Sequence, residues 1–149
     1  TLKLNIMHQA PYFLFVYGSL RSGFHHPAYE YISEFFTLVG NAKTKGLLYD
    51  MGEYPAAVPT TENKFIIGEL YKIKSEDEFG WAIGQLDDYE GVVIEEGETP
   101  LYHREKTIVF INDHKQEAWI YWYNSDIHNR PIIESGDLLE YWKQKNKAT

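Results

Sequence analysis

The sequence predicts an α+β domain: a small, mixed but mostly antiparallel β-barrel with a few helices at its edges. Strand-sized apolar runs outnumber helical segments, and one long helical pattern interrupts them. The chain of 149 residues has no internal repeat, low-complexity tract or linker, and 44% of its residues are hydrophobic. Because this length and composition are typical of one globular domain, we expect a single domain over residues 1–149, with its core at about 12–142.

Strands are expected where apolar residues run continuously or alternate with polar ones. The run from Tyr12 to Tyr17 is continuously apolar, which is typical of a strand buried on both faces. Further strands are predicted over residues 37–49 (one or two strands), 65–73, 102–111 and 117–123. Residues 112–115 suit a hairpin turn between the last two strands, and residues 50–55 are rich in turn formers.

The clearest helical pattern covers Ser75 to Tyr89. Ser75 and Glu78 have the spacing of a capping box, in which each side chain accepts a hydrogen bond from a free backbone N–H. Apolar residues then recur at helical spacing and form one core-facing stripe: Phe79, Ala82, Ile83 and Leu86. Gly91 suits the left-handed position that ends many helices. Shorter helices are expected over residues 27–35 and 136–145.

Glu90 is the candidate catalytic residue that this helix indicates. A step of four residues turns a helix by about 400°, so Glu90 lies only about 40° around the axis from Leu86, on the buried face. Asp87 and Asp88 are expected to point to solvent. Burial, the negative end of the helix dipole and the neighbouring carboxylates would all raise the pKa of Glu90, which suits a group that exchanges protons near neutral pH. The alternative is a frayed helix end, with Glu90 in water and without a chemical role.

The first buried strand ends in the loop Tyr17-Gly18-Ser19-Leu20. Gly18 allows the backbone to turn sharply and to approach a ligand closely. Backbone N–H groups that have left the sheet form concave sites for a carboxylate or an oxyanion. The pattern is neither GxGxxG nor a phosphate loop with its lysine, so it does not indicate a nucleotide site. The alternative is an ordinary turn.

Composition excludes several classes of partner and chemistry. With 14 basic and 22 acidic residues, the formal net charge of −8 argues against nucleic acid or an anionic membrane as a partner. The absence of cysteine excludes disulfides, thiolate catalysis and Cys-ligated zinc, and the histidines lack carboxylates at ligand spacing, so we expect no metal site. No apolar run is long enough to span a bilayer, and the start lacks the apolar core of a secretory signal, so we expect a cytoplasmic protein.

Arg104 is a second charged residue of interest. It shares one face of the predicted strand 102–111 with Tyr102. Arg104 is expected either to bind an anionic group of a substrate or to pair with a structural carboxylate such as Glu69, and the second expectation is favoured.

An ordered series of short motifs resembles the gamma-glutamylcyclotransferase-like family, which includes the gamma-glutamylamine cyclotransferases. The similarity covers about residues 12–142, and its motifs are Phe15-Val16-Tyr17-Gly18-Ser19-Leu20, Tyr54-Pro55-Ala56, Gly68-Glu69-Leu70-Tyr71, Leu86-Asp87-Asp88-Tyr89-Glu90-Gly91, Tyr102-His103-Arg104 and Ser135-Gly136-Asp137. Two departures are the acidic insert Glu95-Glu96-Gly97-Glu98 and Leu138, which stands where a tryptophan is common.

The resemblance implies a small mixed barrel whose cavity lies at the Tyr-Gly-Ser-Leu loop, with Glu90 as the acid–base catalyst. The substrate-binding residues that it implies are Tyr17, Gly18, Ser19, Leu20, Tyr102 and Tyr121. The family reaction releases 5-oxoproline from a small gamma-glutamyl amide by attack of the substrate's own α-amine, so it needs no protein nucleophile, metal or cofactor. Two alternatives stay open: a non-catalytic module of the same fold that binds a small anionic or amino-acid-like ligand, and an enzyme for a different amide.

Overall fold

The computed structural model describes residues 11–18, 20–22, 27–91 and 100–147. Its strands and helices follow one another along the chain as β1 (Phe13–Val16), α2 (Pro27–Phe35), β2 (Phe36–Lys45), β3 (Leu47–Asp50), β4 (Pro55–Val58), β5 (Phe65–Ile73), the 3₁₀ turn η2 (Glu76–Glu78), α3 (Phe79–Glu90), β6 (Tyr102–Ile111), β7 (His114–Tyr123) and α4 (Leu138–Lys147). The predicted helix over residues 27–35 and the predicted strand over residues 65–73 are confirmed with these bounds.

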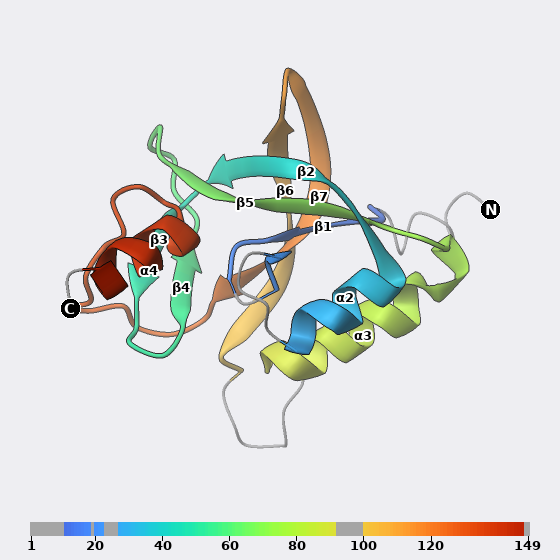
Figure 1. Cartoon of the computed structure of the whole chain (residues 1–149), viewed down its shortest axis with the longest axis horizontal. Helices are drawn as coiled ribbons and strands as arrows, with labels where there is room; N and C mark the ends of the chain where they lie inside the picture. Colours follow the sequence, from blue (N-terminus) through green and yellow to red (C-terminus); the bar gives the residue numbers. More distant parts are fainter. Residues whose placement is uncertain (1–10, 19, 23–26, 92–99, 148–149) are drawn as a thin grey trace.

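Five strands close into a barrel in the order β1-β5-β2-β6-β7 (Figure 1). Four neighbouring pairs are antiparallel, and β7 closes against β1 as a parallel pair in which Leu14 lies opposite Trp119. The strands β3 and β4 form a separate two-stranded antiparallel sheet. The prediction of a small mixed barrel with mostly antiparallel strands is therefore confirmed.

The first strand, β1, is buried on both faces, as its continuous apolar run predicts. Leu14 and Val16 belong to one hydrophobic cluster, which also contains the buried side chains of α2 and α3. Phe15 and Tyr17 point the other way, into a second cluster that reaches Leu138 at the start of α4. Since β1 runs between the two clusters, the loop that follows it is anchored on both sides.

The helices α2 and α3 lie side by side at one end of the barrel (Figure 1), where the Tyr31 hydroxyl donates a hydrogen bond to the Ala82 carbonyl oxygen at 3.3 Å. The predicted apolar stripe of α3 is buried along its whole length: Phe79, Ala82, Ile83 and Leu86 are each at most 4% exposed. The helix α4 lies beside the β3–β4 sheet, away from the pair α2 and α3 (Figure 1). The stripe therefore fixes which side of α3 faces the barrel.

The start of α3 differs from the prediction. Ser75 makes no capping bond through its side chain; its main-chain carbonyl accepts a hydrogen bond from the Glu78 N–H at 3.0 Å. This bond closes the 3₁₀ turn Glu76–Glu78, and the α-helix begins at Phe79. The predicted capping box is wrong because the backbone of the tight turn already satisfies the Glu78 N–H.

Two further features differ from the prediction: the turn between β6 and β7 is shorter, and the structure has one additional strand, β4. Residues 112–115 were expected to form the hairpin turn, but only Asn112 and Asp113 lie between β6 and β7. Asn112 takes a left-handed conformation with φ 52°, which allows this two-residue connection. The strand β4 was not predicted, because Pro55–Val58 follows a turn-rich stretch and contains too few β-branched residues to stand out. It pairs with β3 from Asp50 opposite Pro55 to Leu47 opposite Val58.

Candidate active site

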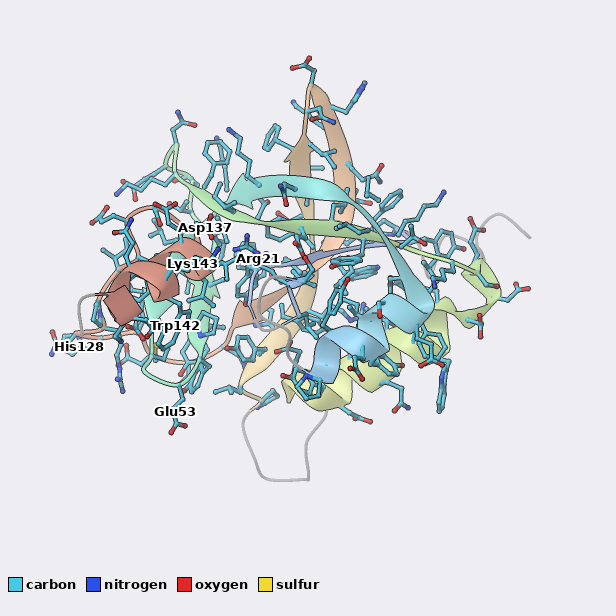
Figure 2. All side chains as sticks on the ribbon, in the orientation of Figure 1. Arg21, Glu53, His128, Asp137, Trp142 and Lys143 are labelled. Carbon is cyan, nitrogen blue, oxygen red and sulfur yellow. The ribbon has the colours of Figure 1, made fainter. Side chains whose placement is uncertain are left out.

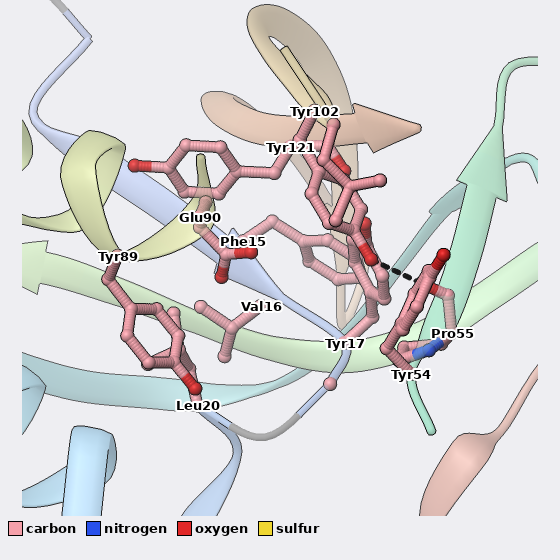
Figure 3. Close-up of a pocket in the computed structure, with 12 residues that line it drawn as sticks. Phe15, Val16, Tyr17, Leu20, Tyr54, Pro55, Tyr89, Glu90, Tyr102 and Tyr121 are labelled. Carbon is pink, nitrogen blue, oxygen red and sulfur yellow. Dashed lines mark hydrogen bonds between the residues drawn. The ribbon is translucent and has the colours of Figure 1, made fainter. Parts of the chain in front are cut away.

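A cavity of about 290 Å³ opens where the end of β1, the start of β4, the last turn of α3 and the beginning of β6 meet (Figure 3). Half of the described residues that line it are aromatic, and Glu90 is the one carboxylate among them. The lining residues are Phe15, Val16, Tyr17, Gly18, Leu20, Tyr54, Pro55, Tyr89, Glu90, Leu101, Tyr102 and Tyr121. The cavity is thus built by segments that are far apart in the sequence, from Phe15 to Tyr121.

The last turn of α3 places Glu90 in this cavity. Gly91 ends the helix in the left-handed conformation, with φ 74°, and its N–H bonds to the carbonyl oxygens of Asp87 and Asp88. The carboxyl group of Glu90 projects from the helix end toward the space between Tyr17 and Tyr102 (Figure 3). Glu90 is partly buried, since only its cavity side is open. The predicted end of the helix and the predicted orientation of Glu90 are confirmed.

Burial raises the pKa of Glu90 to about 7, and the nearby Asp87 carboxylate contributes in the same direction. Both effects disfavour the charged form of the carboxyl group. Near neutral pH, Glu90 therefore exists as a mixture of acid and carboxylate. Such a group can accept a proton at one stage of a reaction and return it at the next.

Two tyrosine hydroxyls in the cavity are held by backbone carbonyl groups. The Tyr102 hydroxyl donates to the Pro55 carbonyl oxygen at 2.6 Å, and the Tyr17 hydroxyl donates to that of Tyr121. Burial, followed by the charge of Glu90 and neighbouring tyrosines, raises the pKa of both Tyr17 and Tyr102 above its ordinary value. Both phenols therefore stay neutral at physiological pH. Since each has donated its hydrogen atom, its oxygen remains available as an acceptor.

The loop after β1 is held from both ends. Gly18 accepts a hydrogen bond from the Arg21 N–H at 3.0 Å, and a Cβ atom on Gly18 would lie 3.3 Å from Cγ of Pro55. Arg21 points toward Asp137 near the start of α4 (Figure 2), and their ion pair measures 2.8 Å. The absence of a side chain at Gly18 thus lets the loop approach Pro55 across the cavity.

Glu69 anchors the far end of the same loop. Its carboxylate accepts hydrogen bonds from the N–H and the hydroxyl of Ser22, at 2.8 and 2.7 Å, and from the Tyr71 hydroxyl at 3.0 Å. The favoured expectation that Arg104 pairs with a structural carboxylate is confirmed, but Glu69 as its partner is wrong, because Glu69 lies on β5 and accepts its hydrogen bonds from Ser22 and Tyr71.

The structural carboxylate that pairs with Arg104 is Asp87, which the sequence did not indicate as the partner. Arg104 binds the Asp87 carboxylate through Nε at 2.7 Å and Nη2 at 3.0 Å, and the Tyr121 hydroxyl donates to Asp87 at 2.8 Å. Asp87 is 7% exposed, so the expectation that it points to solvent is wrong, whereas Asp88 is exposed as expected. Asp87 is buried because the start of β6 brings a guanidinium group across the helix end, a contact that helical spacing cannot show.

Most of the predicted site residues meet in this one cavity. Glu90 is joined there by Tyr17, Gly18, Leu20, Tyr102 and Tyr121. Ser19 and the acidic insert Glu95–Glu98 lie outside the described residues. The sequence did not assign the other six described wall residues to the site: Phe15, Val16, Tyr54, Pro55, Tyr89 and Leu101. Tyr54-Pro55 belongs to the series of motifs, but nothing in its spacing indicates that it faces the loop after β1.

Two searches of the described ranges concern other kinds of site. No three side chains of His, Asp or Glu in these ranges converge as metal ligands would. None of the helices in the same ranges combines the length and the hydropathy of a transmembrane segment.

Proteins of known sequence similar to this chain carry one family description. Residues 14–144 match the family "Gamma-glutamyl cyclotransferase, AIG2-like". A relative from Methanocaldococcus jannaschii, named "Putative gamma-glutamylcyclotransferase MJ1514", is 32% identical over 87% of this chain and 97% of its own length. The Escherichia coli gamma-glutamylcyclotransferase family protein YtfP is 30% identical over 85% of this chain and 96% of its own length.

Solved structures share the fold. YkqA from Bacillus subtilis matches with a TM-score of 0.65 and 27% identity over 92% of this chain, which spans only 42% of that longer protein. The solution structure of Escherichia coli YtfP matches with a TM-score of 0.57 and 29% identity, over 87% of this chain and 97% of YtfP. A mouse AIG2-like protein has a TM-score of 0.60 at 20% identity, over 84% of this chain and 87% of its own, which concerns the fold alone. With its family match, its relatives and its barrel in agreement, this chain belongs to the gamma-glutamyl cyclotransferase, AIG2-like family.

Proposed function

We propose that this protein is a cyclotransferase that cleaves a gamma-glutamyl amide and releases 5-oxoproline, with Glu90 as its general acid and base. The observation that carries the proposal is the carboxyl group of Glu90, the one carboxyl among the described residues that line the cavity, with burial raising its pKa to about 7. Membership of the family supports the class of reaction and of substrate.

The first step prepares the nucleophile. The α-amino group of a gamma-glutamyl compound is an ammonium ion in neutral water and cannot attack until it loses a proton. The Glu90 carboxylate accepts this proton, while the oxygens of Tyr17 and Tyr102, whose hydrogens are donated to carbonyl groups, face the same space as neutral acceptors. An acceptor-lined pocket of this kind suits an ammonium group.

The second step closes the ring. The freed amine attacks the γ-carbonyl carbon of the same molecule and forms the new C–N bond of a five-membered ring. The bond between that carbon and the leaving nitrogen then breaks as Glu90 returns its proton to that nitrogen. The ring nitrogen still carries one proton more than a lactam nitrogen, and the Glu90 carboxylate passes this proton to the released amine, so the products are 5-oxoproline and the amine in its ammonium form. Atoms and charges balance without an added nucleophile, because the substrate supplies its own.

Orientation is the second contribution of the site. An open-chain gamma-glutamyl group must fold back on itself before the amine reaches the carbonyl carbon. The loop at Gly18 and Leu20 provides backbone N–H groups beside the cavity, which suit the α-carboxylate, and the aromatic walls limit the space for extended conformers. Well-oriented intramolecular reactions gain about 7–11 kcal/mol at most over their bimolecular counterparts, so holding the folded conformer is worth several kcal/mol.

The experiment incubates the purified protein with a panel of gamma-glutamyl dipeptides and gamma-glutamyl-ε-lysine, and quantifies 5-oxoproline together with the released amine. The same assays are run on Glu90→Gln, which keeps the size of the side chain and removes its proton-transfer capacity. We expect wild type to release both products in equal amounts and Glu90→Gln to lose at least about 10²-fold in kcat/KM.

Asp88→Asn is the matched control, because Asp88 is an exposed acid two residues away on the same helix. It is expected to retain wild-type activity. Release of 5-oxoproline by a folded Glu90→Gln variant at the wild-type rate would contradict the role of Glu90. A folded wild type that turns over no compound of the panel would instead favour the non-catalytic binding module.

A further inference from the structure

A partly buried ion pair lies directly behind the helix end that carries Glu90. Asp87 precedes Glu90 by three residues in α3, and 7% of its surface is exposed. Two atoms of the Arg104 guanidinium bind its carboxylate, Nε at 2.7 Å and Nη2 at 3.0 Å. A bidentate pair of this type restrains both partners in angle as well as in distance. The last turn of α3 is therefore fixed against β6 by a charged contact.

The pair is also connected to the walls of the cavity. Tyr121, on β7, donates its hydroxyl hydrogen to Asp87 at 2.8 Å, and its main-chain carbonyl accepts the hydroxyl hydrogen of Tyr17. Both tyrosines line the cavity. On its other side the Arg104 guanidinium lies over the Trp119 ring, 4.4 Å from the ring centroid. The ion pair thus links α3, β6, β7 and the end of β1.

We propose that Asp87 and Arg104 are positioning residues for Glu90: their ion pair holds the last turn of α3 on the barrel and sets the charge beside the Glu90 carboxyl group. The catalytic meaning of this inference rests on the proposed function. The effect of the two residues on the pKa of Glu90 can be measured without turnover of any substrate.

The groups that face Glu90 come from four elements. Asp87 lies on its own helix, and three tyrosines approach it from the end of β1, from β6 and from β7: Tyr17, Tyr102 and Tyr121. Burial raises the pKa of each of these tyrosines, so they are uncharged in the neutral range. Asp87 is then the anion that opposes ionisation of Glu90, and Arg104 is the cation paired with Asp87 at 2.7 Å.

This arrangement predicts opposite effects for the two partners. Asp87→Asn removes the neighbouring anion and leaves the Arg104 cation, so the carboxylate form of Glu90 is favoured and its pKa falls. Arg104→Gln removes the cation and leaves the Asp87 anion, so the protonated form is favoured and the pKa of Glu90 rises. A pair that only holds the fold together would not separate the variants in this way, since loosening the helix end exposes Glu90 in both and shifts its pKa in one direction.

The measurement is a carbon-detected NMR titration of protein labelled at the glutamate side-chain carboxyl carbons, with the Glu90 signal assigned by its loss in Glu90→Gln. We expect the pKa of Glu90 to fall by about one pH unit in Asp87→Asn and to rise by about one pH unit in Arg104→Gln, the effect expected of one nearby charge. Arg104→Lys retains the positive charge and is expected to keep the pKa close to that of wild type.

Because loss of one partner from a buried ion pair destabilises a fold strongly, the double variant Asp87→Asn with Arg104→Gln is included, which replaces both charges by amides. Its Glu90 pKa is expected to fall between those of the two single variants. If Asp87→Asn does not fold, the inference is tested by the difference between the Glu90 pKa values of Arg104→Lys and Arg104→Gln.

The inference is overturned if the pKa of Glu90 is the same in Arg104→Lys and Arg104→Gln, or if both charge-removing variants move it in one direction. The two proposals can fail separately. If the cyclotransferase proposal fails, wild type turns over no substrate, but the differences in the pKa of Glu90 between the variants persist. If both hold, the pH at which kcat/KM is half-maximal moves down in Asp87→Asn and up in Arg104→Gln.

Discussion

Glu90 lines the cavity, where its carboxyl group can exchange protons, and its surroundings disfavour the charged form of that group. At the scale of this one residue, the partly buried site raises the pKa of the carboxyl to about 7, and the nearby Asp87 adds to the effect. The same environment has two consequences that are measurable separately, one for activity and one for stability.

The first consequence is a pH dependence of activity. If Glu90 acts as the base in the free enzyme, its carboxylate form is required, so kcat/KM should rise with pH and reach half its plateau near pH 7. The measurement is the initial rate of 5-oxoproline release at low substrate concentration, from about pH 5.5 to 8.5. Asp88→Asn should show the same profile. A plateau that already extends down to pH 5.5 would contradict the role of a carboxyl group with a raised pKa.

The second consequence concerns stability. The folded-state pKa of about 7 lies above the ordinary value of 4.5, so between these values the folded state binds more protons than the unfolded state. The free energy of unfolding therefore falls as pH rises through this window and stays lowered above it. Glu90→Gln lacks the charge and should be more stable than wild type at pH 8, by an amount on the order of 1–3 kcal/mol.

Urea unfolding of both proteins at pH 8 and at pH 4.5 measures this difference. The extra stability of Glu90→Gln should shrink at pH 4.5, where the Glu90 carboxyl of wild type is protonated in the folded state and only half ionised in the unfolded state. An equal or lower stability of the variant at pH 8 would show that the folded state does not penalise the Glu90 carboxylate.

The helix α3 is the element that delivers Glu90, and its two ends are formed differently. Its end is specified locally, because Gly91 adopts φ 74° and stops the helix one residue after Glu90. Its start follows a 3₁₀ turn without a side-chain cap. The helix is therefore held by its buried stripe and by the contacts of Asp87, rather than by strong helix-forming signals at its first turn.

Two glycines provide a matched test of where backbone freedom is needed. A Cβ atom at Gly84, within α3, would meet nothing within 4 Å, whereas one at Gly68, within β5, would lie 2.2 Å from the Val16 carbonyl oxygen. Gly84→Ala should stabilise the protein by about 0.5–1 kcal/mol, because it removes the entropic penalty of glycine in a helix. Gly68→Ala should destabilise it by about 1–3 kcal/mol through overpacking.

The midpoint of urea unfolding is measured for both variants and for wild type. Gly68→Ala should also lower activity, since the displaced carbonyl lies at the end of β1, next to the loop that lines the cavity. Stabilisation by Gly68→Ala would mean that β1 and β5 can separate without loss, contrary to the close approach of these two strands.

At the scale of the whole molecule, the barrel brings the site together and α4 closes the other side of the structure. Asp50, at the end of β3 and 7% exposed, accepts hydrogen bonds from the Tyr141 hydroxyl at 2.6 Å and from Lys145 Nζ at 3.1 Å. Burial acts to raise the pKa of Asp50, but its hydrogen bonds from Tyr141, the Gly52 N–H and Lys145 outweigh it, and the pKa is lowered below its ordinary value. The charged carboxylate therefore anchors α4 to the β3–β4 sheet.

Tyr141→Phe should lower the free energy of unfolding by about 1–2 kcal/mol, because a hydrogen bond to a buried carboxylate is lost. The pKa of Asp50 is depressed in the folded state, so its contribution is present at pH 7 and is lost as pH falls through the acidic range. In urea unfolding experiments, the difference in free energy of unfolding between wild type and Tyr141→Phe should therefore become smaller as the pH falls toward 3. Tyr49→Phe is the control, because its hydroxyl makes no hydrogen bond to the described part of the chain, and it should behave as wild type.

The sequence alone determined the properties that depend on neighbours along the chain. The continuous apolar run of β1, the stripe of α3 and the left-handed Gly91 are local signals, and together they placed Glu90 on a buried helix face. The mostly antiparallel barrel also followed from the number and spacing of the strands. These predictions held because periodicity and turn chemistry act within a few residues.

Only the tertiary structure decided which residues meet across the barrel. Arg104 pairs with Asp87 and not with Glu69, and Tyr54 with Pro55 forms the wall opposite the loop after β1. These contacts join strands and helices that are far apart in sequence, so no spacing along the chain encodes them. The physical reason is that barrel closure sets the distances between the ends of its strands, and a buried charge then pairs with the oppositely charged group that this closure brings within reach.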